Sequence, residues 1–394
     1  MSSVVPEGWR AERLGDVSSL ITKGTTPKTY TNEGVNFIKV ESISTNRTLI
    51  MDKFSKVDLE TYNLQKRSQL ESGDILFSIA GSLGRIAVVR SEHLPANTNQ
   101  ALALIRLKDG DIDNAYCIQQ LSAGRVQSEL KNLQTVGAQP NLSLQQVSDL
   151  LINCPPLPEQ KKIASILTSV DEVIENTQKQ IDKLQDLKKA TMNELLTKGI
   201  GHTEFKDSEL GRIPKSWGVS LIEEVCKVGT GKRDTQNKTK YGKYPFFVRS
   251  QTIERIDSYS FDGEAILTAG DGVGTGKVFH YVNGRFDFHQ RVYKLSDFRG
   301  DALGKFLYYC FSSRFLKQVQ QFSARGSVES VRMEMITGMA IPLPSIQEQS
   351  KIVDCISAIE TNISIGKQKL TQTESLKKSL MQDLLTGKVR VTVN

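Results

Sequence analysis

Cysteine and histidine are scarce in this chain and follow no ligand pattern. The five cysteines are scattered over 394 residues without a C-x-x-C pair, and the four histidines show no H-E-x-x-H or other metal-ligand spacing. An odd, unpatterned set of cysteines fits reduced thiols in the cytoplasm rather than a disulfide framework. We therefore predict a cytoplasmic protein that holds no metal.

Long apolar runs are also missing. No stretch approaches the roughly 18 consecutive apolar residues of a membrane-spanning helix, and the first residues lack the basic and apolar segments of a signal peptide. Apolar residues still make up 38% of the sequence, enough for the cores of the two or three domains expected at this length. We expect no membrane partner, and the net charge of +7 favours a polyanionic one.

The sequence contains only incomplete versions of catalytic motifs. The glycine-rich loop Gly270–Lys277 fails as a phosphate-binding P-loop, because Asp271 stands where its first glycine should be and Val278 replaces the Ser or Thr. A tight turn between strands explains it better. The segment Asn153–Leu157 lacks the aromatic residue of the adenine methyltransferase signature, and no nucleophile elbow is found. We predict no catalytic residue here, which disfavours a self-sufficient nuclease or methyltransferase.

The strongest positive feature is an internal repeat. Residues 159–197 match residues 348–386 at a constant offset of 189 without a gap, and 12 of the 39 positions are identical. A gapless match of this length rarely arises by chance, so two copies of one structural unit are expected. The only two tryptophans, Trp9 and Trp217, each follow a proline by three residues and open the two halves of the chain.

The repeated segments have the periodicity of coiled-coil helices. Apolar residues recur at steps of four and three, and no proline interrupts either segment. The next core position of each copy holds a lysine, Lys188 or Lys377, and we expect the preceding Leu187 and Leu376 to fill the seam instead. The expected seam residues are Ile163, Leu167, Val170, Ile174, Ile181, Leu184 and Leu187 in the first copy, and Ile352, Ile356, Ile359, Ile363, Leu370 and Leu376 in the second.

The segments that precede the two helices read as mixed globular heads. Short apolar runs typical of strands alternate with glycine-rich turns, and helical stretches follow them. The predicted class is α+β, with two similar mixed α/β heads separated by two long antiparallel coiled-coil helices in a pseudo-twofold repeat. The predicted boundaries are 1–154 for the first head, 155–200 for the central helix, 201–340 for the second head and 341–394 for the C-terminal helix.

The second head carries a basic and aromatic stretch. Residues 227–249 hold seven Lys or Arg residues, one acid and four interleaved aromatic residues. Cations neutralise phosphates, and Arg also reads guanine edges. A solvated loop is the alternative, but the place of this stretch in a repeated head favours DNA. The predicted DNA contacts are Lys23, Thr25, Thr26, Lys28, Asn99 and Gln100 in the first head, and Lys232, Arg233, Lys277, His289, Gln290 and Arg291 in the second.

The order of these parts resembles the specificity subunit of type I restriction-modification systems. The resemblance rests on the doubled layout and on the helix starts Pro-Pro-Leu-Pro-Glu-Gln160 and Pro-Leu-Pro-Ser-Ile-Gln-Glu-Gln349, and it covers essentially the whole chain. The chain departs from a strict repeat in two ways. The second helix start has two extra residues, Ser345 and Ile346, and the first head is longer than the second.

The resemblance implies a non-catalytic subunit that recognises double-stranded DNA. Each head would read one half of a split, asymmetric site, and the paired helices would fix the gap between the halves. The helices would also dock two modification subunits, which carry S-adenosylmethionine, while restriction subunits would add ATP- and Mg-dependent translocation and cleavage. No cofactor is expected in this chain itself. The alternative that remains is a coiled-coil adaptor with protein-binding heads.

Overall fold

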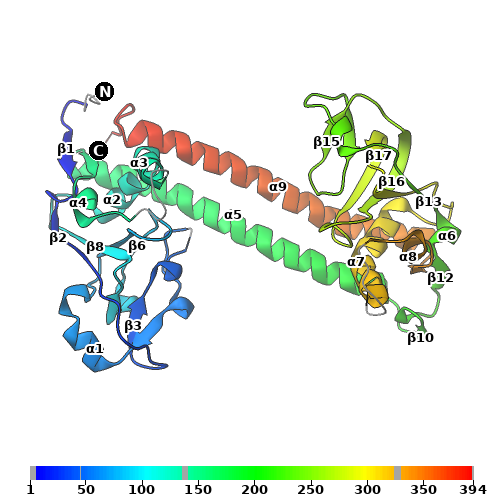
Figure 1. Ribbon diagram of the computed structural model, residues 1–394, viewed down its shortest axis with the longest axis horizontal. Helices are drawn as coiled ribbons and strands as arrows, with labels where there is room; N and C mark the ends of the chain where they lie inside the picture. Colours follow the sequence, from blue (N-terminus) through cyan, green and yellow to red (C-terminus); the bar gives the residue numbers. More distant parts are fainter. Residues whose placement is uncertain (1–5, 45, 135–140, 324–329, 393–394) are drawn as a thin grey trace. The chain divides into compact units, whose positions relative to one another are not determined.

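The computed structural model describes residues 6–44, 46–134, 141–323 and 330–392. It confirms the predicted α+β class with its internal repeat (Figure 1). The chain packs into two compact units, the first made of Met1–Lys179 with Lys367–Asn394 and the second of Gln180–Gly366. Each unit therefore contains one head together with a part of both long helices. The four segments predicted from the sequence describe the order along the chain rather than these packing units.

The first unit builds its head on two small sheets. Strands β2, β8, β5 and β6 form one sheet in the order β2-β8-β5-β6, and β4-β3-β7 form another, in which β3 and β7 run parallel. A separate ribbon pairs β1 with β9 beside the start of the central helix. The elements are β1 (Arg10–Arg13), β2 (Ser18–Lys23), β3 (Val35–Ile38), β4 (Ser55–Val57), α1 (Leu59–Leu64), β5 (Ile75–Ser78), β6 (Ile86–Val88), β7 (Ala96–Thr98), β8 (Leu102–Leu107), α2 (Asn114–Leu121), α3 (Gly124–Gln134), α4 (Leu144–Ser148) and β9 (Leu151–Cys154).

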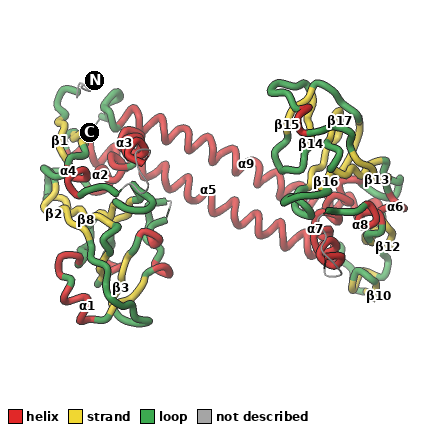
Figure 2. Tube along the Cα trace, viewed as in Figure 1, coloured by secondary structure: helices red, strands yellow, loops and turns green. Residues whose placement is uncertain are grey.

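The second unit repeats this plan, and Figure 2 draws its strands in yellow. Six of them form a continuous sheet of order β13-β18-β16-β17-β14-β15. Here β14 and β17 run parallel, as β3 and β7 do in the first unit, and β12 pairs with β19 as β1 does with β9. The elements are β10 (Phe205–Ser208), β11 (Gly211–Pro214), β12 (Gly218–Leu221), α6 (Ile222–Val225), β13 (Lys227–Thr230), β14 (Tyr244–Phe247), β15 (Glu254–Ile256), β16 (Phe261–Ala269), β17 (Phe279–Phe288), β18 (Val292–Ser296), α7 (Gly304–Ser323), α8 (Met333–Thr337) and β19 (Ala340–Leu343).

The two long helices, α5 (Leu157–Lys198) and α9 (Ile346–Leu384), start in the same way. Gln160 and Gln349, identical positions of the repeat, each donate from Nε2 to a proline carbonyl at 2.9 Å. Their Oε1 atoms accept a backbone N–H of the head, from Asp113 at 2.9 Å and from Leu303 at 2.8 Å. Both glutamines are buried, so every polar atom they bring needs a partner. The repeated Gln thus ties each helix start to its own head.

Each tryptophan binds the glutamate that directly precedes the repeated Gln. Trp9 Nε1 donates to Glu159 at 3.1 Å, and Trp217 Nε1 donates to Glu348 at 3.0 Å. Glu159 also pairs with Arg390 at 2.8 Å, and Glu348 with His202 at 2.7 Å. The repeated Trp and Glu positions therefore form the same contact in each unit.

Antiparallel pairing of the helices occurs inside each unit. In the first unit Lys377 of α9 lies 2.5 Å from Asp171 of α5, and in the second Lys188 of α5 lies 2.9 Å from Glu360 of α9. Asp171 and Glu360 are separated by the repeat offset of 189, as are Lys188 and Lys377. The same acid–lysine pair is thus built twice, with the roles of the two helices exchanged.

The seam is formed largely by the residues that the sequence predicts. Six of them are buried, five are half-buried and two are exposed. The buried ones that pack into the head cores are Ile163, Leu167, Ile352 and Ile356, and Ile181 and Ile363 are buried along the helices. The half-buried ones are Val170, Ile174, Leu184, Ile359 and Leu370.

The expectation for Leu187 and Leu376 is wrong. Their side chains are 51% and 53% exposed, and Lys188 and Lys377 keep the seam position instead. Each lysine stays there because an acid on the facing helix pairs with its ammonium group, which offsets the cost of partial burial. The drift toward the straight-helix period that would bring the leucines inward does not occur.

Candidate nucleic-acid interface

The predicted DNA contacts of the first head lie at the end of β2 and on the segments that follow β2 and β7. After β2 the chain crosses the segment that follows β7, and Thr25 N donates to the Thr98 carbonyl at 3.1 Å. Gly24 makes this crossing possible, because a Cβ there would lie 2.0 Å from the Thr98 oxygen. We call residues 24–28 the first crossing segment. It places exposed Thr25 next to Thr98, which directly precedes Asn99 and Gln100, and Thr26 and Lys28 of this segment are exposed as well.

The second head repeats this crossing with different side chains. A Cβ on Gly231 would lie 2.1 Å from the Phe288 carbonyl, so Gly231 corresponds to Gly24 and Phe288 to Thr98. Gln290 N donates to the Arg233 carbonyl at 2.8 Å, which joins residues 231–235, the second crossing segment, to the turn after β17. The backbone is shared and the exposed side chains differ. Such a pair of surfaces suits two readers of different sequences.

The turn residues after β7 and β17 have a structural role in both heads. Asn99 Oδ1 accepts the Ala101 N–H at 3.1 Å, and His289 Nδ1 accepts the Arg291 N–H at 2.9 Å. His289 is only 3% exposed, and burial, together with the charge of Arg249, lowers its pKa. The neutral imidazole therefore supports the turn from behind the surface. The burial of His289 does not favour the predicted direct contact with DNA, which stays a prediction.

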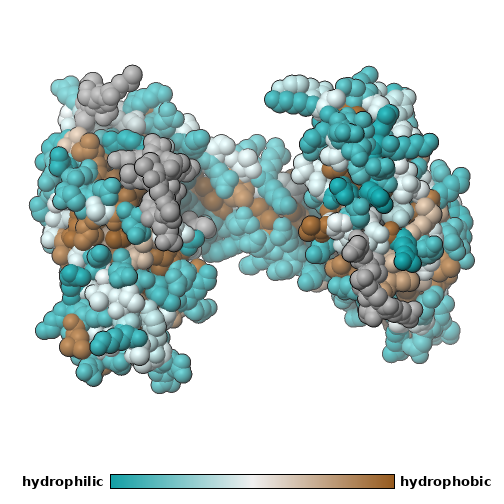
Figure 3. Space-filling view, in the orientation of Figure 1, coloured by the Kyte–Doolittle hydropathy of each residue, from teal (hydrophilic) through white to brown (hydrophobic). Residues whose placement is uncertain are grey.

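The other predicted residues of the second head lie at the surface. Lys232, Lys277, Gln290 and Arg291 are exposed. Gln290 Nε2 donates to Asp234 at 3.2 Å. Lys277 lies in the Gly270–Lys277 loop between β16 and β17, which is the predicted tight turn: Lys277 N and Val278 N donate to the Gly274 carbonyl at 3.0 and 2.9 Å. On the face drawn in Figure 3, hydrophilic side chains predominate over the part of this unit that carries β15 and β17.

Sequence reasoning missed Asp287, which is fully buried behind the second crossing segment. Its carboxylate accepts hydrogen bonds from Ser258 at 2.7 Å, Ser260 at 2.8 Å and Arg233 at 3.1 Å. Burial alone would raise the pKa of Asp287, but these hydrogen bonds outweigh it and lower the pKa below its usual value. An acid inside the strand Phe-Asp-Phe-His289 was the available signal, since such residues are rarely buried without partners.

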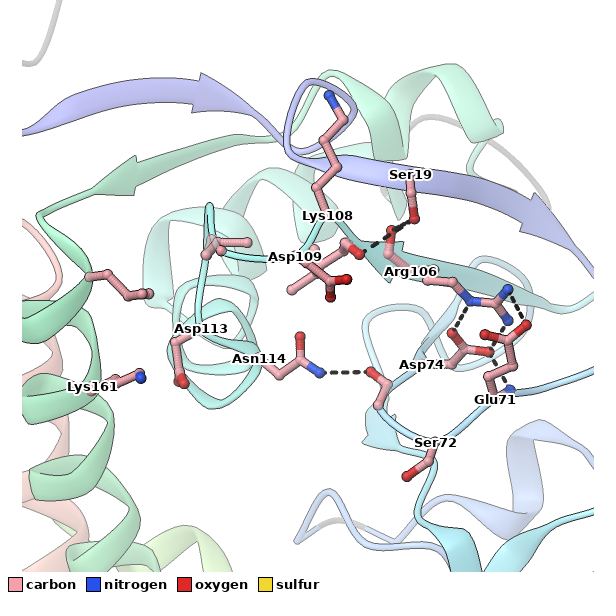
Figure 4. A pocket seen from close by; sticks show the side chains of 15 residues that line it. Ser19, Glu71, Ser72, Asp74, Arg106, Lys108, Asp109, Asp113, Asn114 and Lys161 are labelled. Atoms are coloured by element: carbon pink, nitrogen blue, oxygen red, sulfur yellow. Dashed lines mark hydrogen bonds and ion pairs between the residues drawn. The ribbon is translucent and has the colours of Figure 1, made fainter.

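A separate pocket of about 740 Å³ opens at the other end of β2 and β8, near Ser19 (Figure 4). Its Arg106 is held by Asp74 at 2.7 Å and by Glu71 at 2.6 Å. Asp109 and Asp113 add further acids to the wall. Lys108 and Lys161 also line the pocket, but its four carboxylates outnumber its three cations. Because the guanidinium is already paired as well, this pocket is poorly suited to a phosphate group.

Within the described ranges, no three His, Cys, Asp or Glu residues are placed to hold a metal ion together. No helix of the described chain has the length and apolar character needed to cross a membrane.

Comparison with curated proteins gives relatives of matching length. A specificity subunit described as putative, of the MjaX type I restriction enzyme from Methanocaldococcus jannaschii, is 27% identical over 417 residues, covering 98% of this chain and 95% of the relative. The MjaVIII specificity subunit of the same organism is 28% identical over 422 residues, covering 98% and 94%. Both alignments therefore span the two heads and both helices.

Solved structures share the fold. The type I S subunit of M. genitalium superposes with a TM-score of 0.67 at 14% identity, covering 100% of this chain and 98% of that one. A chain from a study of assembly and conformational transition of the type I R-M system reaches 0.58 at 17% identity, covering 98% and 99%. The model of the type I restriction modification DNA specificity domain matches residues 6–186 and again residues 214–375. Because this domain model accounts for most of both halves, the chain belongs to the type I restriction-modification DNA specificity family.

Proposed function

We propose that this chain is the DNA sequence-specificity subunit of a type I restriction-modification enzyme. One observation carries the proposal: the same crossing of backbone segments is built once in each head and presents different polar side chains. Thr25 and Thr26 stand in the first head where Lys232 and Arg233 stand in the second. Each head would then read its own half of a bipartite, asymmetric site, since side chains on a shared scaffold decide which base edges are bound.

The chain would contribute recognition and leave the chemistry to its partners. Two modification subunits would bring S-adenosylmethionine, and restriction subunits would bring ATP and Mg-dependent activity. The incomplete catalytic motifs of the sequence agree with this division. A cytoplasmic location, where such partners would meet DNA, stays a prediction.

The helices would serve both as spacer and as docking surface. Their inner faces are used by the seam and by the acid–lysine pairs, whereas Leu187, Leu376 and many polar positions face outward. An outward face is available to a modification subunit. A coiled-coil adaptor with protein-binding heads is not favoured, because the family match covers the heads as well as the helices.

Exchange of one head tests the proposal. Residues 201–340 would be replaced by the corresponding head of a relative, and the complex with its modification subunit would be assayed by sequencing of N6-methyladenine. We expect one half of the recognised site to change while the other half and the gap stay the same. Changes in both halves, or in neither, would contradict independent reading by the two heads.

A further inference from the structure

Arg233 is presented by the second crossing segment in an unusual way. Its Nε donates to Asp287 at 3.1 Å, and its side chain is 43% exposed. Among the described residues, no hydrogen bond engages its two terminal nitrogens, Nη1 and Nη2. A guanidinium has a rigid, planar set of donors, so fixing Nε also fixes where the Nη edge points. This edge is free to bind a ligand.

Asp287 is equally well held. Ser258 and Arg233 donate to Oδ2, while Ser260 and the Phe288 N–H donate to Oδ1 at 2.8 and 3.1 Å. The neighbouring acid, Asp234, accepts a hydrogen bond from the Gln290 amide instead and makes none to Arg233 among the described residues. A fully buried carboxylate with four donors moves little, so Arg233 has a firm base on one side and a free edge on the other.

The free edge matches one base in particular. Two parallel N–H donors from Arg fit the O6 and N7 acceptors of guanine in the major groove, and this is the commonest specific contact between protein and DNA. Adenine offers N7 next to a donor amino group, so it accepts only one of the two bonds. A phosphate would also accept both bonds, but it carries no sequence information.

The first head lacks this arrangement at the corresponding positions. The parallel pairing of Phe37 with Asn97 and of Phe246 with Asp287 makes Asn97 the counterpart of Asp287. Thr26, two residues after Gly24, is the counterpart of Arg233, two residues after Gly231. Asn97 is fully buried, and neither of its amide atoms has a partner within the described residues. The pairing of a surface arginine with a buried carboxylate is thus specific to the second head.

We propose that Arg233 reads a guanine in the half-site of the second head and that buried Asp287 is its positioning residue. This inference rests on the proposed function, which it deepens by naming one base. It predicts that the second half-site contains at least one G·C pair and that recognition of this pair depends on Arg233. The first half-site has no such dependence on Thr26 or Asn97.

The full complex with its modification subunit provides the test, in a host without other adenine methylation. N6-methyladenine would be mapped across the genome for the unchanged chain and for Arg233→Gln, Arg233→Lys and Asp287→Asn. We expect Arg233→Gln to lose preference for guanine at one position of one half-site, a loss of about 5- to 150-fold in discrimination. Arg233→Lys, which can still donate to the same acceptors but lacks the rigid planar fork, should lose part of that preference. Asp287→Asn should weaken the same preference, and the other half-site should stay unchanged.

Controls separate base reading from loss of charge and from loss of folding. Lys277→Gln removes an exposed cation of the same head and should lower methylation evenly across sequences. Arg233 is partly exposed, so its variants should melt like the unchanged protein.

The proposal is overturned if the Arg233 variants keep the motif, weaken methylation evenly, or relax a position that is not G·C. If Asp287→Asn keeps the full preference, Asp287 has no positioning role. If the unchanged complex yields no bipartite motif, the proposed function itself fails.

Discussion

At the scale of single residues, the repeated glutamates link the helix starts to the heads. Hydrogen bonding from Arg390, and to a smaller degree from Trp9, lowers the pKa of Glu159, although burial opposes this shift. A carboxyl group with a lowered pKa in the folded state stabilises the protein above its ordinary pKa of about 4.3. That contribution disappears as the pH falls toward the lower, folded-state pKa.

Replacement of Glu159 by Gln should therefore destabilise the chain in a pH-dependent way. The variant loses charge-assisted hydrogen bonds of a buried group, which typically costs about 1–3 kcal/mol. We expect a lower melting temperature at pH 7 and a smaller difference from the unchanged protein near pH 4. Thermal unfolding at a series of pH values measures both. Glu172→Gln, an exposed acid on the same helix, is the matched control and should change little; a pH-independent difference for Glu159 would contradict the assignment.

The sequence shows that Glu159, Gln160 and Trp9 recur, but it does not show what they bind. Their partners lie far along the chain: Trp9 and Glu159 are 150 residues apart, and Glu159 and Arg390 are 231 apart. The same holds for Arg233 and Asp287, separated by 54 residues. Such long-range side-chain pairs depend on how distant segments pack in the folded chain. No local sequence pattern reveals that packing.

At the scale of elements, the helix pair shows how periodicity is decided by pairing. The four-and-three pattern correctly predicts most of the seam, because apolar residues on one face of a helix seek burial. It fails at Leu187 and Leu376, since a paired lysine competes successfully with a neighbouring leucine for the same position. Charged groups on a facing helix are invisible to a pattern read along one helix.

Alanine substitution distinguishes the two descriptions of the seam. Leu187→Ala removes a half-exposed side chain and should change the free energy of unfolding by less than about 0.5 kcal/mol. Ile356→Ala empties a fully buried position and should cost about 2–5 kcal/mol. Denaturant unfolding of the full chain provides the comparison. If the two variants lose equal free energies of unfolding, Leu187 is part of the seam after all.

Charge reversal tests the acid–lysine pair of the second unit. Lys188→Glu places a second carboxylate beside Glu360, which already accepts a hydrogen bond from Tyr309 at 2.6 Å. We expect this variant to be destabilised by about 1–3 kcal/mol through like-charge repulsion and the loss of the pair. Adding Glu360→Lys should recover part of the loss. If the double variant is the sum of the two single ones, the contact contributes no coupling energy.

At the scale of the whole molecule, two similar heads on a shared helix pair suit a split DNA site. Lengthening the spacer tests this idea. Because α5 and α9 pair antiparallel in each unit, seven residues inserted after Gln185 need seven more in the facing part of α9, after Ile363. One heptad keeps the phase of the seam and adds about 10 Å of helix.

The matched insertion should lengthen the gap between the two half-sites and leave both half-sites unchanged. N6-methyladenine mapping of the complex reads out the gap directly. An insertion in α5 alone serves as the contrast, since it breaks the pairing and should lower stability. An unchanged gap in the doubly lengthened protein would refute the role of the helices as a spacer.

The internal repeat makes the order of heads and helices predictable from the sequence. The positions of the side chains expected to contact DNA are only partly predictable. Lys23, Thr25, Asn99 and Gln100 could be grouped because the two heads share anchor residues such as Gln100 and Gln290. The same analogy predicts that His289 contacts DNA, yet this side chain lies buried beneath the turn. Whether a side chain of this turn is exposed depends on how two distant segments cross. A similarity between short motifs does not reveal that crossing.

Mapping N6-methyladenine across a genome, with and without this gene beside its modification subunit, tests the role in DNA specificity most directly. We predict that one bipartite motif, two short blocks around a fixed gap, is methylated only when this chain is present. A methylation map that is the same with and without the chain, while the modification subunit is expressed, would contradict that role.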